Sequence, residues 1–172
     1  MRNIFNSLVQ PHGDYCSQLW MPSQAQQMET IENLAKSFTS KIPWLREESY
    51  WSRLKILRMN SQERRMECYR ILYTWKILEG LVPNCGVELV GEAEDRQGRR
   101  CKVQSGTLAR RLQSFQVGGP KAFNSLPSYI RNTTKCSLED FMDNLDSFLS
   151  KVPDEPKICG LMSHSSLLDV TS

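Results

Sequence analysis

Hydrophobic and polar positions follow a helical period along most of the chain, and the clearest stretch runs from Asn60 to Pro83. Asn60 or Ser61 can accept hydrogen bonds from the free N–H groups of a first turn, and Glu63 suits the positive end of a helix. Gly80 fits the left-handed residue that follows a helix, and Pro83 prevents continuation. Between these signals, apolar residues recur at three- and four-residue steps: Met66, Tyr69, Leu72, Tyr73 and Ile77. The pattern predicts a central helix.

The two halves of this central helix differ in polarity. The apolar face widens through Cys68, Ile71, Trp75 and Leu78, which predicts burial on several sides. A polar stripe lies mainly in the first half, beside Arg64 and Arg65, and consists of Glu63, Glu67, Arg70 and Thr74. We therefore expect the second half in the core and the first half near a charged surface.

A second amphipathic helix is predicted from Ser23 to the residue before Pro43. Ser23 and Gln26 have capping-box spacing, and the apolar stripe that follows is Met28, Ile31, Leu34, Ala35, Phe38 and Ile42. The opposite face carries charges of both signs and is expected in solvent: Glu29, Glu32, Asn33 and Lys36.

Shorter elements are predicted on both sides of these helices. An amphipathic N-terminal segment is expected to stop at Pro11, and a short helix with basic outward residues is expected over 49–57. Ser137 and Asp140 form a capping box for a last helix that ends by Pro153. Residues 118–120, GGP, suggest a turn into a helix over 121–126, and residues 101–104, CKVQ, are expected to pair with residues 114–117, SFQV, as a small β-hairpin.

Length and composition favour one folded domain. The 172 residues are 40% hydrophobic, with four Trp and five Tyr, which argues against wholesale disorder. The mean hydropathy of −0.47 and the lack of a long apolar run argue against a membrane span, and the N-terminus has no continuous apolar region of a signal peptide. We expect a mainly α protein of five to six helices over residues 1–152, a flexible tail over 153–172, and an intracellular location, nuclear or cytoplasmic.

No residue pattern indicates catalysis, a metal or a cofactor. The six cysteines are scattered without a CxxC pair, so free thiols are favoured over a long-range zinc site. Cys16, His12 and Asp14 are interpreted as ordinary turn residues rather than as a nucleophilic constellation. Four acidic residues of the last helix are interpreted as capping and solvating it rather than as metal ligands: Glu139, Asp140, Asp143 and Asp146.

Positive charge gathers in two places although the net charge is only +3. The first cluster spans residues 53–70 and contains Arg53, Lys55, Arg58, Arg64, Arg65 and Arg70. The second follows an acidic stretch and contains Arg96, Arg99, Arg100, Lys102, Arg110 and Arg111, with glycines between them. A solvated surface is the ordinary interpretation of either cluster, but flexible basic loops also suit phosphate contacts, which need charge and reach.

Three separated blocks point to a known family. They are SLVQPHGDYCSQLWMPS, ERRMECYRILYTWKILEGLVPNCG and SFQVGGPKAFNSLPSYIRN, in that order. With the later VPDEPKI they resemble the C-terminal, thumb and post-thumb region of reverse transcriptases from non-LTR retrotransposons (LINE elements, jockey-like), over roughly residues 7 to 158. The resemblance implies a helical thumb that grips an RNA–DNA primer–template duplex by its backbone. The residues expected to contact nucleic acid are Arg64, Arg65, Arg96, Arg99, Arg100, Lys102, Arg110 and Arg111.

The chain departs from that family where catalysis is concerned. The family's palm lies upstream of the matched region and holds two Mg²⁺ ions on an Asp-Asp turn, whereas this sequence contains no Asp-Asp pair. We therefore expect no polymerase activity from this chain alone. The alternative functions are binding of the palm, another protein or itself through an exposed apolar face, or a retroelement fossil with no role.

Overall fold

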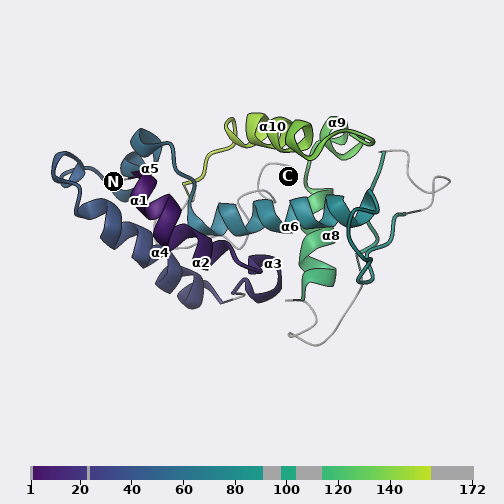
Figure 1. Ribbon diagram of the computed structural model, residues 1–172, viewed down its shortest axis with the longest axis horizontal. Coiled ribbons are helices and arrows are strands. Elements are labelled where there is room, and N and C mark those ends of the chain that lie inside the picture. Colours follow the sequence, from purple (N-terminus) through teal and green to yellow (C-terminus); the bar gives the residue numbers. More distant parts are fainter. Residues whose placement is uncertain (1, 23, 91–97, 104–113, 156–172) are drawn as a thin grey trace.

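The computed structural model describes residues 2–22, 24–90, 98–103 and 114–155, and this part of the chain is mainly helical, as predicted. The long helix α6 (Gln62–Leu78) runs through the middle of the molecule (Figure 1). The N-terminal helices and α4 (Ala25–Ser40) lie at one end of it, while α8 (Phe115–Asn124) crosses its other half. The central position predicted for this segment is thus confirmed.

The remaining helices are short. They are α1 (Arg2–Ile4), the π-helical turn η1 (Phe5–Val9), α2 (Gln10–Asp14), α3 (Ser17–Trp20), the 3-10 turn η2 (Pro43–Leu45), α5 (Tyr50–Leu57), α9 (Ser128–Arg131) and α10 (Leu138–Leu149). The described residues therefore contain more helices than the five to six predicted. Several are single turns separated by bends, and the spacing of apolar residues does not predict such bends.

The N-terminal segment continues past Pro11, contrary to prediction. Pro11 lies in the first turn of α2, directly after the π-helical turn η1, and the backbone stays helical through it. The continuous run α1–η1–α2 brings Asp14 to α6, and buried Phe5 packs 4.8 Å from the ring of Phe38 on α4.

Helix α4 presents a different face to the core than predicted. Met28 and Ala35 are buried as expected, but Glu32 is also fully buried and Leu34 is 61% exposed. Glu32 tolerates burial because the Tyr50 hydroxyl and the backbone N–H of Gln62 both donate to its carboxylate. The expectation that Glu32 faces solvent was therefore wrong. The helix cap is Gln24 without a side-chain bond, and Ser23 lies outside the described residues.

Both end signals of α6 are confirmed. The Ser61 hydroxyl accepts from the N–H of Arg64 at 3.1 Å, and Gly80 has a φ of 72°. Its second half forms the core, where the rings of Trp75 and Phe141 stack with centroids 4.6 Å apart. Two members of the predicted polar stripe, Glu67 and Thr74, are buried, so the stripe is not a solvent face.

Helix α8 overturns two predictions. Residues 114–117 cap and begin this helix rather than forming a strand, and the expected turn at 118–120 lies inside it. A Cβ on Gly118 would come within 2.6 Å of Nη1 of Arg70, and one on Gly119 within 2.6 Å of Oγ1 of Thr74. The paired glycines thus let α8 lie unusually close to α6.

The predicted hairpin between 101–104 and 114–117 was wrong. In the described residues Cys101 instead forms an isolated antiparallel bridge with Leu89, supported by backbone bonds from Val90 to Arg100 and from Lys102 to Glu88. The side-chain amide of Asn124 on α8 also pairs with both backbone groups of Cys101 at 2.8 Å. The amide occupies the place that a neighbouring strand was expected to take.

The capping box of the last helix is confirmed, with Ser137 and Asp140 bonded reciprocally at the start of α10. Residues 153–155, assigned to the tail from the sequence, include Asp154, whose carboxylate accepts from the N–H and the hydroxyl of Ser61, both at 2.7 Å. The rest of the predicted tail lies outside the described residues.

Candidate functional site

Arg64, the first residue expected to contact nucleic acid, lies in the interior. Its side chain is 2% exposed, and its guanidinium donates to the carbonyls of Leu149 at 3.0 Å, Val152 at 2.7 Å and Pro153 at 2.6 Å. Nε lies 3.2 Å from a carboxylate oxygen of Asp154. Arg64 therefore ties α6 to the end of α10, and its charge is not offered to a phosphate.

Arg65 is half-buried and held by the N-terminal segment. Its Nη2 lies 2.5 Å from Oδ2 of Asp14, which also accepts from the Tyr69 hydroxyl at 3.0 Å. Burial lowers the pKa of Arg65, but the hydrogen bond and the charge of Asp14 outweigh it, so the pKa is raised above its ordinary value. The same Asp14 is thereby committed to α6, away from the catalytic arrangement with His12 and Cys16 that the sequence already disfavoured.

The second basic cluster is only partly within the described residues. Arg99 donates to the carboxylate of Glu79 at 2.6 Å and to the carbonyl of Leu78 at 3.0 Å, so it anchors its loop to the end of α6. Arg100 is half-buried and has an interaction within the chain. Lys102 is exposed and lies 3.6 Å from exposed Glu88, a weak pair in water. Arg96, Arg110 and Arg111 lie outside the described residues.

A different group of exposed cations lies at the C-terminal ends of α4, η2 and α5. Ile42, Leu45 and Leu57 form a small buried cluster that holds η2 against the end of α5. Each member has an exposed cation directly beside it in the chain, namely Lys41, Arg46 and Arg58. We call Lys41, Arg46, Arg58 and Trp44, which is 68% exposed, the η2 corner.

The side chains of Lys41, Arg46 and Arg58 form no hydrogen bond or ion pair with any residue that the structure describes. This distinguishes them from Arg64, Arg65 and Arg99. Exposed Glu47 and Glu48 follow Arg46 and reduce the local positive charge. Arg58 belonged to the first basic cluster predicted from the sequence, but Lys41 and Arg46 were not singled out, although a Trp between two cations was a readable signal. Arg53, expected outward on α5, is instead buried near the Tyr50 ring.

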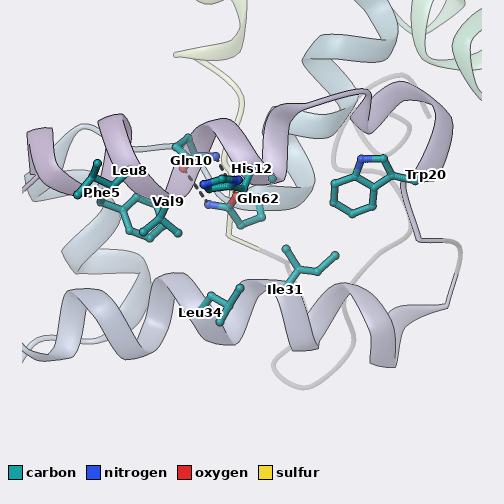
Figure 2. A pocket seen from close by; sticks show the side chains of 10 residues that line it. Phe5, Leu8, Val9, Gln10, His12, Trp20, Ile31, Leu34 and Gln62 are labelled. Carbon is teal, nitrogen blue, oxygen red and sulfur yellow. Dashed lines mark hydrogen bonds between the residues drawn. The ribbon is translucent and has the colours of Figure 1, made fainter.

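An apolar groove of about 370 Å³ lies between the N-terminal helices and α4. Figure 2 shows Leu8 and Val9 on one wall, Ile31 and Leu34 on the other, and Trp20 at one end. Beside it, the side-chain amides of Gln10 and Gln62 bond to each other at 3.0 Å. The groove thus offers mainly hydrocarbon surface.

Carboxylates gather at the N-terminal end of α6. Burial, together with the charges of Glu67, Glu32 and Asp154, raises the pKa of Glu63 to about 8. Burial likewise raises the pKa of Glu32, although the hydrogen bond from Tyr50 opposes it. Glu32 accepts from the N–H of Gln62, and Asp154 accepts from Ser61 and pairs with Arg64, so these two carboxylates stabilise the fold.

Several chemistries find no support in the described part of the chain. No group of three His, Cys, Asp or Glu side chains there is arranged to hold a metal ion, and no helix there is long and apolar enough to cross a membrane. None of the described cysteines forms a disulfide with another described residue. Burial raises the pKa of Cys68 and of Cys101 to about 12, so both thiols stay protonated at neutral pH.

Comparisons with protein-family models, with curated proteins and with solved structures find no match to this chain.

Proposed function

We propose that this chain is a non-catalytic nucleic-acid-binding unit, similar to the C-terminal region of LINE-type reverse transcriptases, that contacts the backbone of an RNA–DNA hybrid through the η2 corner. One observation carries the proposal: Lys41, Arg46 and Arg58 are exposed and unpaired within the described residues, and Trp44, which lies between the first two in the chain, is exposed as well. The resemblance of the three sequence blocks to that family supports the choice of nucleic acid.

The chemistry of the η2 corner suits phosphates. Unpaired cations release counterions when they meet a nucleic-acid backbone, whereas an arginine already bound to a carboxylate must first break that bond. The ring of Trp44 adds a flat surface on which a base or sugar can pack. Such contacts do not depend on the base sequence. This suits a region similar to part of a reverse transcriptase, which must copy any template.

The basic residues between 96 and 111 supply a second contact in this proposal. Arg96, Arg100, Lys102, Arg110 and Arg111 remain candidates there. Arg64, Arg65 and Arg99 are left out, because intrachain carbonyls and carboxylates occupy their guanidinium groups. The proposal assigns no chemical step to the chain, since the sequence carries no Asp-Asp pair to hold Mg²⁺.

The test measures affinity for a labelled RNA–DNA hybrid by fluorescence anisotropy across about 50 to 300 mM salt. Replacing Lys41, Arg46 and Arg58 by Ala is expected to weaken binding and reduce the slope of log affinity against log salt by about 2 to 3. The matched control replaces two exposed lysines elsewhere, Lys121 and Lys151, and is expected to change the slope less.

A second variant keeps the test independent of folding defects. Glu47→Gln/Glu48→Gln removes two negative charges from the same surface and is expected to tighten binding at low salt. A wild-type chain that does not bind the hybrid, or a triple variant with an unchanged salt slope, would refute the η2 corner as the interface.

A further inference from the structure

We propose that the groove between α1–η1–α2 and α4 binds one face of a helix from another protein chain, and that this face is apolar and uncharged. This goes beyond nucleic-acid binding and uses a different surface. The groove presents hydrophobic side chains that water would otherwise cover: Leu8 is 65% exposed and Leu34 is 61% exposed. Exposed apolar residues that line one depression mark interaction sites more often than scattered ones do.

The shape of the groove suits a helix. Its two walls are helical, with Leu8 and Val9 on one and Ile31 and Leu34 on the other, and Trp20 closes one end (Figure 2). Side chains at three- and four-residue steps on a third helix would enter between these walls, as ridges enter grooves in ordinary helix packing.

The charge distribution indicates what that helix must look like. Between residues 3 and 22 the only charged side chain is Asp14, and Arg65 holds it. On α4, Gln27, Thr30 and Ser37 share the face of Ile31 and Leu34 and are polar but uncharged. The first cation along this face is Lys41, the C-cap residue two turns beyond Leu34, which belongs to the η2 corner. Glu32 points into the core, where Tyr50 and Gln62 satisfy it.

A partner with charged residues at this contact would lose their hydration and find no opposite charge in return. A partner with leucine or similar residues, flanked by uncharged polar ones, matches both walls. Depletion of charge at the centre of a contact is also what protein–protein interfaces show. A phosphate backbone is disfavoured in the groove for the same reason, since no Lys or Arg lines it and His12 is the one titratable side chain of its lining.

The probe is a synthetic helical peptide of about four turns, with leucine along one face, glutamine and alanine beside it, and lysines only on the opposite face. We expect it to bind the full chain with little dependence on salt. Leu34→Lys is expected to weaken binding about tenfold or more, because a charge enters the contact. Ile56→Lys, at an apolar residue of α5 that is 49% exposed, is the matched control and is expected to leave the affinity unchanged.

A second peptide carries glutamates in place of the flanking glutamines and is expected to bind about tenfold more weakly. Equal affinity of the two peptides, no binding of the first, or an unchanged affinity in Leu34→Lys would overturn the proposal. So would sedimentation that shows a wild-type dimer abolished by Leu34→Lys, since a second copy would then occupy the groove. Affinity of Leu34→Lys for the RNA–DNA hybrid stays at the wild-type level if the two surfaces are independent, which separates this result from the fate of the η2 corner.

Discussion

Arg64 and Asp154 form an ion pair, with 3.2 Å between Nε and the carboxylate, although Arg64 is almost completely buried. The pair joins the first turn of α6 to the segment that follows α10. An arginine in a basic sequence cluster is thereby a structural link, and this relationship changes which residues are worth testing for nucleic-acid binding.

Replacing Arg64 by Ala is expected to lower the free energy of unfolding by about 3 to 5 kcal/mol. The substitution removes the charged partner of Asp154 and one donor from each of three carbonyls, those of Leu149, Val152 and Pro153. Urea unfolding followed by circular dichroism measures the loss. Arg46→Ala, at an exposed position, is the control and is expected to stay within about 0.5 kcal/mol of wild type. A stable Arg64→Ala variant with impaired hybrid binding would contradict this assignment.

The two glycines of α8 are expected to respond differently to alanine. At Gly119 a Cβ would meet Thr74 and the ring of Phe115 at 2.6 and 2.8 Å, so overpacking is expected to cost about 1 to 3 kcal/mol. At Gly118 the nearest atoms belong to the end of the Arg70 side chain, which can shift, and helix propensity favours alanine. Gly118→Ala is therefore expected to be less destabilising. Thermal unfolding of both variants measures the two losses of stability. A larger loss for Gly118→Ala than for Gly119→Ala would show that α6 and α8 are not closely packed at Gly119.

Stability is expected to fall as the pH rises from about 5 to 8. The pKa of Glu63 is raised from 4.5 to about 8, so in that window the folded chain holds a proton that the unfolded chain has lost. The raised pKa of Glu32 acts in the same direction. Urea unfolding at several pH values measures the slope. Glu63→Gln is expected to flatten the slope and to be more stable than wild type at pH 8, and an unchanged slope would contradict the assignment.

Tyr50→Phe is expected to destabilise the fold by about 1 to 3 kcal/mol, because the buried Glu32 carboxylate loses its hydroxyl donor. The double-mutant cycle with Glu32→Gln isolates the contact. A coupling energy near zero in urea unfolding would show that Tyr50 stabilises the chain by packing alone.

Much of the helical framework was predictable because its signals are local. The bonds from the N–H of Arg64 to Ser61 and between Ser137 and Asp140 span three residues, and Gly80 needs only its own backbone angle. The corresponding positions in the sequence therefore identified where α6 and α10 begin and where α6 ends. Exposure of the η2 corner was less visible from the sequence, because the cations on either side of Trp44 indicate a polar surface but do not decide whether its ring packs into the core.

The sequence by itself thus determined the helical class, the central helix and its caps, since short-range hydrogen bonds and apolar spacing suffice for these. Tertiary structure alone decided which charges are buried. Arg64 meets partners 85 to 89 residues away, and Glu32 accepts from a backbone N–H 30 residues away. Tertiary structure also decided that Gly118 and Gly119 lie in a helix, because the lack of side chains at these positions lets α6 approach α8 closely. Burial of a charge depends on distant donors, and no local pattern encodes them.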